Sequence, residues 1–457
     1  MGLSRGELLR KLVHIGCVAF AFLLRYMSGA QAAAMAAAAF LFNWQVLPRV
    51  GGKGLWRGAD HARGYPIGIL LYPLAVLGLI LWFWNSLWIA AALWGVLAVG
   101  DGMASVVGQA VGGPRLPWND RKGWAGFAAF VVFGTLAAAV LIAWTTRLPL
   151  DLRSWHAGRT LALAFSVSLA CALVESIPTT LDDNLTIPLA GAALFPLFAQ
   201  ADPLLLATDP DLGRRLALGL VLNGAIGFMA WRARAIDGPG ATSAVVIGTA
   251  ITVGLGLPAL ALMVTFFVVG TTATRLGYRI KAQRGIAQER GGARGWRHAW
   301  ANGGVAALLA LLAGLTSVPL RDLLVLAYSG AVATAAADTC SSEIGKAFGR
   351  RTFLITSLQP VPPGTEGAIS LEGTLGGLLG AALVASVGAA LGVYSWPLAV
   401  LVTVAGMLGS LAESVIGTVA ERRGWLDNNL LNALNTAIGA AFAVLLVDLS
   451  AGVGLAR

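Results

Sequence analysis

The sequence predicts an all-α fold, a polytopic membrane helical bundle with roughly 13 to 15 transmembrane helices. Hydrophobic residues make up 57% of the 457 residues and charged residues only 12%, which is typical of a chain whose main solvent is lipid. Apolar stretches of about 20 residues, the length that crosses a bilayer as a helix, follow one another along most of the chain. These stretches lack the period-two alternation of a transmembrane β-barrel, the other architecture that spans membranes.

The predicted spans follow in chain order and are separated by polar loops. They occupy residues 12–28, 31–48, 67–84, 86–106, 124–145, 158–181, 214–231, 241–257, 259–275, 301–316, 320–342, 372–393, 396–419 and 430–450, with a shorter apolar stretch near 185–200. If the amino terminus is cytoplasmic, the loops that carry most of the Lys and Arg residues lie on the cytoplasmic side, as the positive-inside rule requires. We therefore expect a multi-pass protein of the cell membrane whose sites face the cytoplasm.

The net charge of +10 belongs mainly to these loops, which set the topology and meet anionic lipid headgroups. Nucleic acid is therefore not an expected partner. The three cysteines, Cys17, Cys171 and Cys340, lack the spacing of a disulfide or zinc framework. We expect them to serve packing.

The most polar interruption of the chain predicts two domains. It contains Asp209-Pro210-Asp211 and Arg214-Arg215. The domains are expected to cover residues 1–205 and 206–457, because clusters of Pro and charged residues mark breaks between apolar segments.

A polar constellation occurs once in each half. Its members are Asp101, Ser105, Gly108 and Gly112 in the first copy, and Asp338, Ser342, Gly345 and Gly349 in the second. Positions i, i+4, i+7 and i+11 share one face of a helix, so each copy lines a single stripe. Ionisable groups inside a bilayer cost roughly 2.5 kcal/mol or more, which favours a functional role. A carboxylate beside bare backbone suits Mg²⁺ (or Mn²⁺) and phosphate oxygens, although small residues at this spacing also serve helix packing.

A second carboxylate follows each stripe, namely Glu175 in the first half and Glu413 in the second, and both lie at the end of a long apolar run. Such a group could complete a metal site or accept a proton from a substrate hydroxyl. The candidate catalytic residues are Asp101, Lys122, Glu175, Asp338 and Glu413, and the candidate metal ligands are Asp101, Glu175, Asp338, Glu343 and Glu413.

Basic loops also follow both stripes, where cations could neutralise the charge on transferring phosphoryl oxygens or simply set the topology. The candidate nucleotide-binding or phosphate-binding residues are Ser105, Gly108, Gly112, Arg115, Arg121, Asp183 and Asn184 in the first half, and Ser342, Gly345, Lys346, Gly349, Arg350, Arg351, Gly364, Thr365, Gly373, Thr374 and Asn428 in the second. Capping of a helix is the alternative role for Asp183, Asn184 and Asn428. Arg10, Lys11 and His14 are either part of the first site or interfacial residues.

Ordered motifs between residues 7 and 200 carry a family resemblance. They are Glu7-x-x-Arg10-Lys11-x-x-His14, Gly100-Asp101-Gly-Met-Ala-Ser105, Lys122-Gly-Trp-Ala-Gly126, Glu175-Ser176 and Asp182-Asp183-Asn184-Leu185-x-x-Pro188. With these motifs the first half resembles the phytol and dolichol kinase family, which is close to CTP-dependent cytidylyltransferases. The resemblance implies phosphorylation of an isoprenoid alcohol with CTP as the donor.

Residues 215–445 resemble a different family. The motifs are Asp237-Gly-x-Gly240, Arg294-Gly, Asn302-Gly-Gly, Asp338-x-x-x-Ser342-Glu343, Val361-Pro-Pro-Gly364-Thr365-Glu-Gly367 and Ser370-Leu-Glu-Gly373-Thr374. They are similar to those of the TMEM19-like membrane proteins, which include plant phytyl-phosphate kinase. The resemblance adds Asp237, Arg294 and Asn302 to the candidate site residues.

Together the two resemblances imply a fusion of two kinases that act in succession. The first would convert a membrane-embedded isoprenoid alcohol such as phytol or geranylgeraniol to its monophosphate, and the second would convert the monophosphate to the diphosphate. A neutral hydroxyl benefits from a base, whereas a phosphate acceptor needs cations. Two alternatives remain, namely a secondary transporter of an anionic metabolite or lipid and a CTP-dependent cytidylyltransferase.

Overall fold

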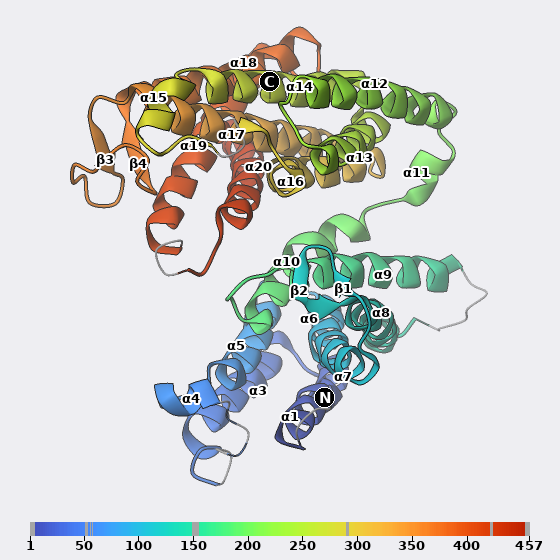
Figure 1. Cartoon of the computed structure of the whole chain (residues 1–457). Helices are drawn as coiled ribbons and strands as arrows, with labels where there is room; N and C mark the ends of the chain where they lie inside the picture. Colours follow the sequence, from blue (N-terminus) through green and yellow to red (C-terminus); the bar gives the residue numbers. More distant parts are fainter. Residues whose placement is uncertain are drawn as a thin grey trace. The chain divides into compact units, whose positions relative to one another are not determined.

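The computed structural model describes residues 5–50, 54, 56, 58–148, 155–288, 292–420 and 424–452. The chain divides into two compact units, Met1–Gln200 and Ala201–Arg457, and each is described by itself (Figure 1). This division lies close to the boundary expected near residue 205. Both units consist almost entirely of helices, which confirms the all-α class.

Helices of the first unit follow the chain from blue to green in Figure 1. Its elements are α1 (Arg5–Gly16), α2 (Val18–Ala21), η1 (Phe22–Tyr26), α3 (Gly29–Leu41), η2 (Phe42–Val46), α4 (Gly58–Arg63), α5 (Ile67–Trp82), α6 (Leu87–Gly95), η4 (Val96–Asp101), α7 (Gly102–Val111), β1 (Arg115–Leu116), β2 (Asn119–Gly123), α8 (Trp124–Thr146), α9 (Trp155–Glu175) and α10 (Asp183–Ala199). Local sequence sets several of these boundaries. A capping box at Ser28 and Gln31, for example, begins α3.

The second unit runs from green to red in Figure 1. Its elements are α11 (Pro203–Ala207), α12 (Leu212–Arg232), α13 (Gly238–Leu255), α14 (Leu257–Arg275), α15 (Tyr278–Gln283), α16 (Trp296–Gly314), α17 (Leu320–Phe348), β3 (Thr352–Leu354), β4 (Ala368–Ser370), α18 (Leu371–Ala390), α19 (Trp396–Ala420) and α20 (Asn428–Gly452). Most of α17 is buried, so this helix forms the centre of the unit.

Ten helices among the described residues are long and apolar enough to cross a membrane, fewer than the 13 to 15 spans expected. The apolar stretch 12–28 is broken into α1, α2 and η1. The helices α5 and α10 are apolar but shorter than a full span. Hydropathy reports how apolar a stretch is, whereas breaks in a helix depend on local backbone geometry, so several of the expected spans are shorter or interrupted helices in the structure.

One topology occurs in both units. A helix that carries the Asp-Ser-Gly stripe leads through a two-stranded antiparallel hairpin into a second helix, and two more helices follow. The elements are η4–α7, β1–β2, α8, α9 and α10 in the first unit, and α17, β3–β4, α18, α19 and α20 in the second.

Glycines let the stripe helix and the next helix cross closely in both units. A Cβ added to Gly108 would lie 3.2 Å from the Cα atom of Gly126, and one added to Gly373 would lie 3.3 Å from the Cα atom of Gly345. Such contacts between small residues are the usual way in which membrane helices approach each other. The packing role considered for the stripe glycines is therefore present at Gly108 and Gly345.

Candidate active sites

Three carboxylates from different elements converge in the first unit. Asp101 ends η4, Glu175 ends α9 and Asp183 begins α10. One carboxylate oxygen from each lies within 4.8 Å of the other two. Asp101 and Glu175 are only 6% and 7% exposed. Two buried like charges and one partly exposed one would repel one another strongly at this separation, so cations or a metal must compensate them.

Helix α1 supplies one compensating cation to Asp101. The Nζ atom of Lys11 donates to Oδ2 of Asp101 at 3.1 Å, and Nε2 of His14 lies 3.4 Å from the same oxygen. The Tyr72 ring packs against the His14 ring with centroids 4.6 Å apart, which holds the imidazole in place. The structure thus brings Lys11 and His14 to the first site, and Arg10 precedes them on the same helix.

The turn η4 that ends at Asp101 is π-helical and interrupts the run from α6 to α7. Turns of this kind contain one residue more than an α-helical turn and are frequent at functional sites. Glycines flank the carboxylate on both sides. A Cβ added to Gly100 would lie 3.1 Å from the Phe130 ring, and one added to Gly102 would overlap with α1. These glycines therefore let α8 and α1 approach the backbone at Asp101.

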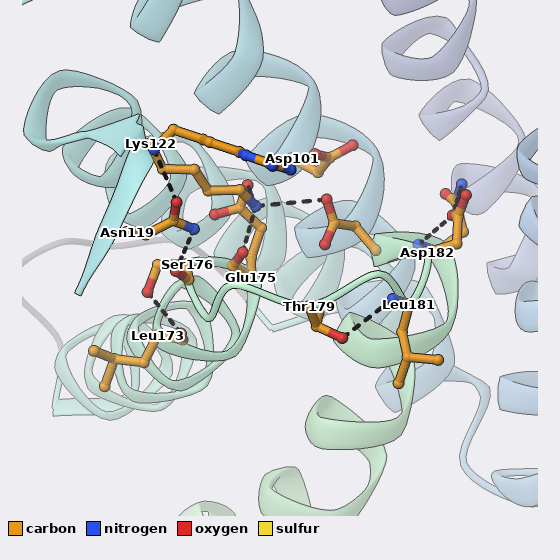
Figure 2. Close-up of polar contacts among 12 residues, drawn as sticks. Asp101, Asn119, Lys122, Leu173, Glu175, Ser176, Thr179, Leu181 and Asp182 are labelled. Carbon is orange, nitrogen blue, oxygen red and sulfur yellow. Dashed lines mark hydrogen bonds and ion pairs between the residues drawn. The ribbon is translucent and has the colours of Figure 1, made fainter. Parts of the chain in front are cut away.

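Lys122 at the end of β2 links the other two carboxylates (Figure 2). Its Nζ atom lies 2.6 Å from Oε1 of Glu175 and 3.6 Å from Oδ2 of Asp183. The same ammonium also donates to the backbone carbonyl of Glu175. Lys122 is 30% exposed, so a cation at the edge of the cluster remains accessible to a substrate.

The β1–β2 hairpin is attached to the end of α9, and this positions Lys122. Nδ2 of Asn119 donates to the carbonyl oxygen of Ser176 at 2.9 Å (Figure 2). Nε1 of Trp118 donates to the Ser176 hydroxyl at 2.9 Å. Arg115 and Arg121 lie on the exposed part of the hairpin, where Nη1 of Arg115 donates to the Arg121 carbonyl at 3.1 Å. The structure does not place these two arginines in the carboxylate cluster.

Asp182 and Asp183 have different roles at the start of α10. Asp182 is the N-cap, and its Oδ1 accepts from the backbone N–H of Asn184 at 3.0 Å. The Nδ2 atom of Asn184 donates to the same oxygen at 2.8 Å. The buried Oδ1 atom of Asn184 has no hydrogen-bond donor within the described part of the chain. Capping thus falls to Asp182, while Asp183 is free to join the carboxylate cluster.

This donor set fits a hard divalent cation. Asp101, Glu175 and Asp183 supply carboxylate oxygens close together, and Asn184 has an unpaired amide oxygen at the adjoining position. Mg²⁺ takes oxygen ligands and binds through a few carboxylates together with substrate phosphates. Ser105 follows Asp101 by one helical turn on α7 and is half-buried. Gly112, with φ of +67°, ends α7 and directs the chain into the hairpin.

The second unit contains a polar pocket of about 1050 Å³ at its Asp-Ser-Gly stripe. The pocket lies between α16, α17, α18, α19, α20 and the segment 352–370. It brings together most of the residues predicted for the second site, namely Arg294, Asn302, Asp338, Ser342, Glu343, Gly345, Lys346, Gly364, Thr365, Gly373, Thr374, Glu413 and Asn428. These residues are up to 134 positions apart along the chain, from 294 to 428.

Four predicted residues are not among those that line this pocket. Gly349 ends α17. Arg350 and Arg351 are exposed at the start of the hairpin. Asp237 caps α13 by accepting from the Gly240 N–H at 2.8 Å, and its own N–H donates to the Arg294 carbonyl at 3.2 Å. Asp237 therefore positions the backbone that carries Arg294.

Glu343 was predicted as a metal ligand, but its carboxylate forms an ion pair with Lys281 of α15. Lys281 is 0% exposed and also donates to the Thr274 carbonyl at 2.8 Å. Breaking a pair of this kind leaves a buried unpaired charge, which is costly. Within the described ranges, the carboxylates of the second unit do not form a close group of three like that of the first. Asp338 and Glu413 are then the better-suited ligands, since Mg²⁺ needs only one or two carboxylates beside phosphates.

Arg294 is a cation that lines the same pocket. Burial lowers the pKa of the Arg294 guanidinium, and the nearby Glu343 and Asp338 carboxylates act in the opposite sense. Guanidinium groups remain charged in proteins, so the pocket holds a fixed positive charge. Such a group binds phosphate oxygens with two parallel hydrogen bonds.

The two sites differ at the start of their last helix. Asp182 caps α10 and Asp427 caps α20, where the Leu430 N–H donates to Oδ1 of Asp427 at 2.8 Å. The next position is Asp183 in the first unit and Asn428 in the second. A carboxylate of the first site is therefore replaced by a neutral amide in the second. Asn432, one turn farther along α20, also lines the polar pocket of the second unit.

Comparisons with known proteins identify the family. Residues 221–440 match the family model described as integral membrane protein DUF92. The chain is 40% identical over 200 residues to the membrane protein sll0875 of Synechocystis sp., an alignment that covers 44% of this chain and 78% of the relative. The chain belongs to the DUF92 family of integral membrane proteins.

Other relatives of this DUF92 protein are plant chloroplast proteins, and one of them is named a phytol kinase. Protein VTE6, chloroplastic, of Arabidopsis thaliana is 36% identical over 216 residues, which are 46% of this chain and 65% of the relative. Phytol kinase 1, chloroplastic, of the same plant is 34% identical over 125 residues, which are 27% of this chain and 40% of the relative. The chain thus spans less than two thirds of these two relatives. No solved structure matches the chain.

The DUF92 match contains every residue that lines the polar pocket of the second unit, and several of these residues were not predicted from the sequence. His298 and Asn432 lie one helical turn from the predicted Asn302 and Asn428, and the spacing i, i+4 could have identified them. Glu366 lies inside the quoted Gly364–Gly367 motif and also lines the pocket. The pairing of Lys281 with Glu343 had no local signal, because the two residues are 62 positions apart.

Proposed function

We propose that this DUF92 protein is a bifunctional membrane kinase of isoprenoid acceptors. The first unit phosphorylates a prenol such as phytol or geranylgeraniol, and the second converts the monophosphate to the diphosphate. CTP is the donor and Mg²⁺ (or Mn²⁺) the metal in this proposal, and both sites face the cytoplasm of the cell membrane. The observation that carries it is the repeated topology with a carboxylate site in each unit, in a chain whose relatives include proteins named phytol kinase and farnesol kinase.

The first site has the groups that a neutral hydroxyl acceptor requires. Asp101, Glu175 and Asp183 would hold the metal, which would neutralise charge on the nucleotide phosphates when bound. Lys122 at the edge of the cluster would stabilise charge on the transferring phosphoryl oxygens. A carboxylate of this cluster would take the hydroxyl proton, a step for which Glu175 at the end of α9 is the candidate.

The second site suits an acceptor that is already anionic. Arg294 and Lys346 supply cations in a wide polar pocket, and Asn428 replaces the third carboxylate of the first site. An amide contributes hydrogen bonds without repelling a phosphate. The phosphate acceptor needs charge neutralisation more than proton removal, so cations take the place of a base.

The test follows both steps in the purified full-length protein. Labelled CTP is supplied with geranylgeraniol or with geranylgeranyl monophosphate, and the lipid and nucleotide products are identified. We expect Asp101→Asn to abolish monophosphate formation while supplied monophosphate is still converted, and Asp338→Asn to do the reverse.

Three outcomes contradict the proposal. If either substitution stops both steps in a protein that remains monodisperse, the two sites are not independent. Release of pyrophosphate in place of CDP identifies a cytidylyltransferase. Absence of any nucleotide-dependent product, together with substrate movement across vesicles that depends on a gradient, identifies a transporter.

A further inference from the structure

A second pocket of about 760 Å³ lies beside the polar pocket of the second unit. Helices α12, α13, α14 and α16 form its walls. Most of its lining is apolar, including Ile226, Ile247, Leu260, Met263 and Phe267. Pockets with a mainly apolar lining are typical binding sites for small molecules, with a few polar groups that fix the orientation of the ligand.

The two pockets share Arg294, His298 and Asn302. His298 and Asn302 are one turn apart on α16, and Arg294 precedes the helix by two residues. The guanidinium carbon of Arg294 lies 5.7 Å from the centre of the Phe266 ring, an aromatic residue of the apolar wall. One polar boundary therefore separates a hydrocarbon-like space from the space that contains Asp338 and Glu413.

The apolar pocket extends deep into the unit from this boundary. Gly270 of α14 lies at the level of Arg294, since a Cβ added to Gly270 would be 3.1 Å from Nη2 of that arginine. Leu260 lies ten residues earlier on the same helix, a separation of about 15 Å along the helix axis. Leu260 also lines the pocket, so the space runs parallel to α14 over much of that length.

The deep part of the pocket offers little to a polar ligand. Asn223 is the polar side chain there, and its Nδ2 atom already donates to the Gly219 carbonyl at 2.8 Å. Among the described lining residues, Arg294 and His298 alone can carry a charge, and both stand at the boundary. An occupant must therefore have one anionic end and one long apolar end.

We infer that this apolar pocket binds the hydrocarbon chain of the acceptor of the second unit, with its phosphate at Arg294, His298 and Asn302. This inference rests on the proposed conversion of an isoprenyl monophosphate. The phosphate would then face the polar pocket, where Asp338 and Glu413 would hold the metal that binds the nucleotide phosphates. The competing occupant is an acyl chain of a membrane phospholipid, which the experiment distinguishes.

The first measurement compares acceptors of different chain length. Met263→Trp fills the middle of the pocket, and Val268→Trp adds the same ring on an exposed face of α14 outside the pocket. For Met263→Trp we expect the ratio of kcat/KM for geranylgeranyl to that for geranyl monophosphate to fall about tenfold or more, because steric discrimination in apolar pockets has this size. The control should leave the ratio unchanged. An equal loss for both acceptors, or no change, overturns the inference.

The second measurement does not depend on catalysis. Labelled geranylgeranyl monophosphate is bound to the full-length protein in detergent without nucleotide or metal, and binding should weaken about tenfold in both Met263→Trp and Arg294→Gln. Binding that survives both substitutions, or that a phospholipid displaces as well as unlabelled prenyl phosphate does, overturns the inference. If the expected binding pattern holds but no diphosphate forms with any nucleotide, the proposed function fails while the pocket assignment stands.

Discussion

Replacement of Lys122 by Met removes the cation between the buried Glu175 carboxylate and the partly exposed Asp183 carboxylate. We take an effective dielectric constant of about 20. The Lys122 ammonium then attracts the Glu175 carboxylate, at 2.6 Å, by about 6 kcal/mol and the Asp183 carboxylate, at 3.6 Å, by about 5 kcal/mol. The ligand oxygens of the three carboxylates lie within 4.8 Å of one another, so the same dielectric constant gives a repulsion of about 3.5 kcal/mol or more for each pair. Lys122 therefore offsets most of the mutual repulsion in the cluster.

Desolvation cancels part of this attraction, so the measured cost is smaller. Loss of one partner from a buried ion pair costs about 3–5 kcal/mol. Lys122 is 30% exposed, which reduces the expected loss to about 2–4 kcal/mol. For a unit of about 200 residues this corresponds to a decrease in Tm of about 5–15 °C.

The assay is thermal unfolding of the detergent-solubilised protein, followed by tryptophan fluorescence with and without MgCl₂. A divalent cation should restore much of the lost stability in Lys122→Met, because it replaces the missing positive charge among the carboxylates. Arg159→Met is the matched control, since it removes an exposed cation from α9. The reasoning is refuted if Lys122→Met unfolds at the same temperature as the wild type, or if Mg²⁺ has no larger effect on the variant than on the wild type.

Three further predictions concern the rest of the chain. Lys281→Met should lower the free energy of unfolding by about 3–5 kcal/mol because it leaves the buried Glu343 carboxylate unpaired, and adding Glu343→Gln should recover part of the loss in thermal unfolding. Asn428→Asp should raise the KM for a prenyl monophosphate about tenfold, because it adds a negative charge to the pocket; an unchanged KM in steady-state kinetics would contradict this role. Gly126→Ala should lower stability by about 1–3 kcal/mol, because its Cβ would lie 2.9 Å from a carbonyl oxygen of α7. Gly158→Ala on α9, where no atom lies within 4 Å, should be neutral or slightly stabilising in the same unfolding measurement.

The features that could be predicted were those whose residue types differ clearly from the surrounding sequence. Charged residues are rare in apolar runs, so Asp101, Glu175 and Asp338 stood out, and the structure places the first two in one cluster and the third in a polar pocket. Helical spacing predicted the stripe but could not separate packing from binding at Gly108 and Gly345, because both roles require a small residue.

Features formed by ordinary apolar residues, or by residues far apart in the sequence, could not be predicted. The apolar pocket is lined by residues such as Leu260 and Met263, which look like any other apolar residue of a membrane helix. The pair of Lys281 with Glu343 depends on the packing of α15 near α17. The breaks between α1, α2 and η1 depend on local backbone geometry, which hydropathy does not register.

The π-helical turn before Asp101 has a consequence for aligning the two halves of the chain. It adds one residue to the turn that ends at the carboxylate, whereas α17 continues as a regular α-helix through Asp338. One extra residue corresponds to a rotation of about 100° around the helix axis. The stripes at 101–112 and 338–349 therefore align without a gap, but residues before the two aspartates fall out of phase. An alignment of the two stripe helices therefore needs a one-residue gap between Val96 and Asp101.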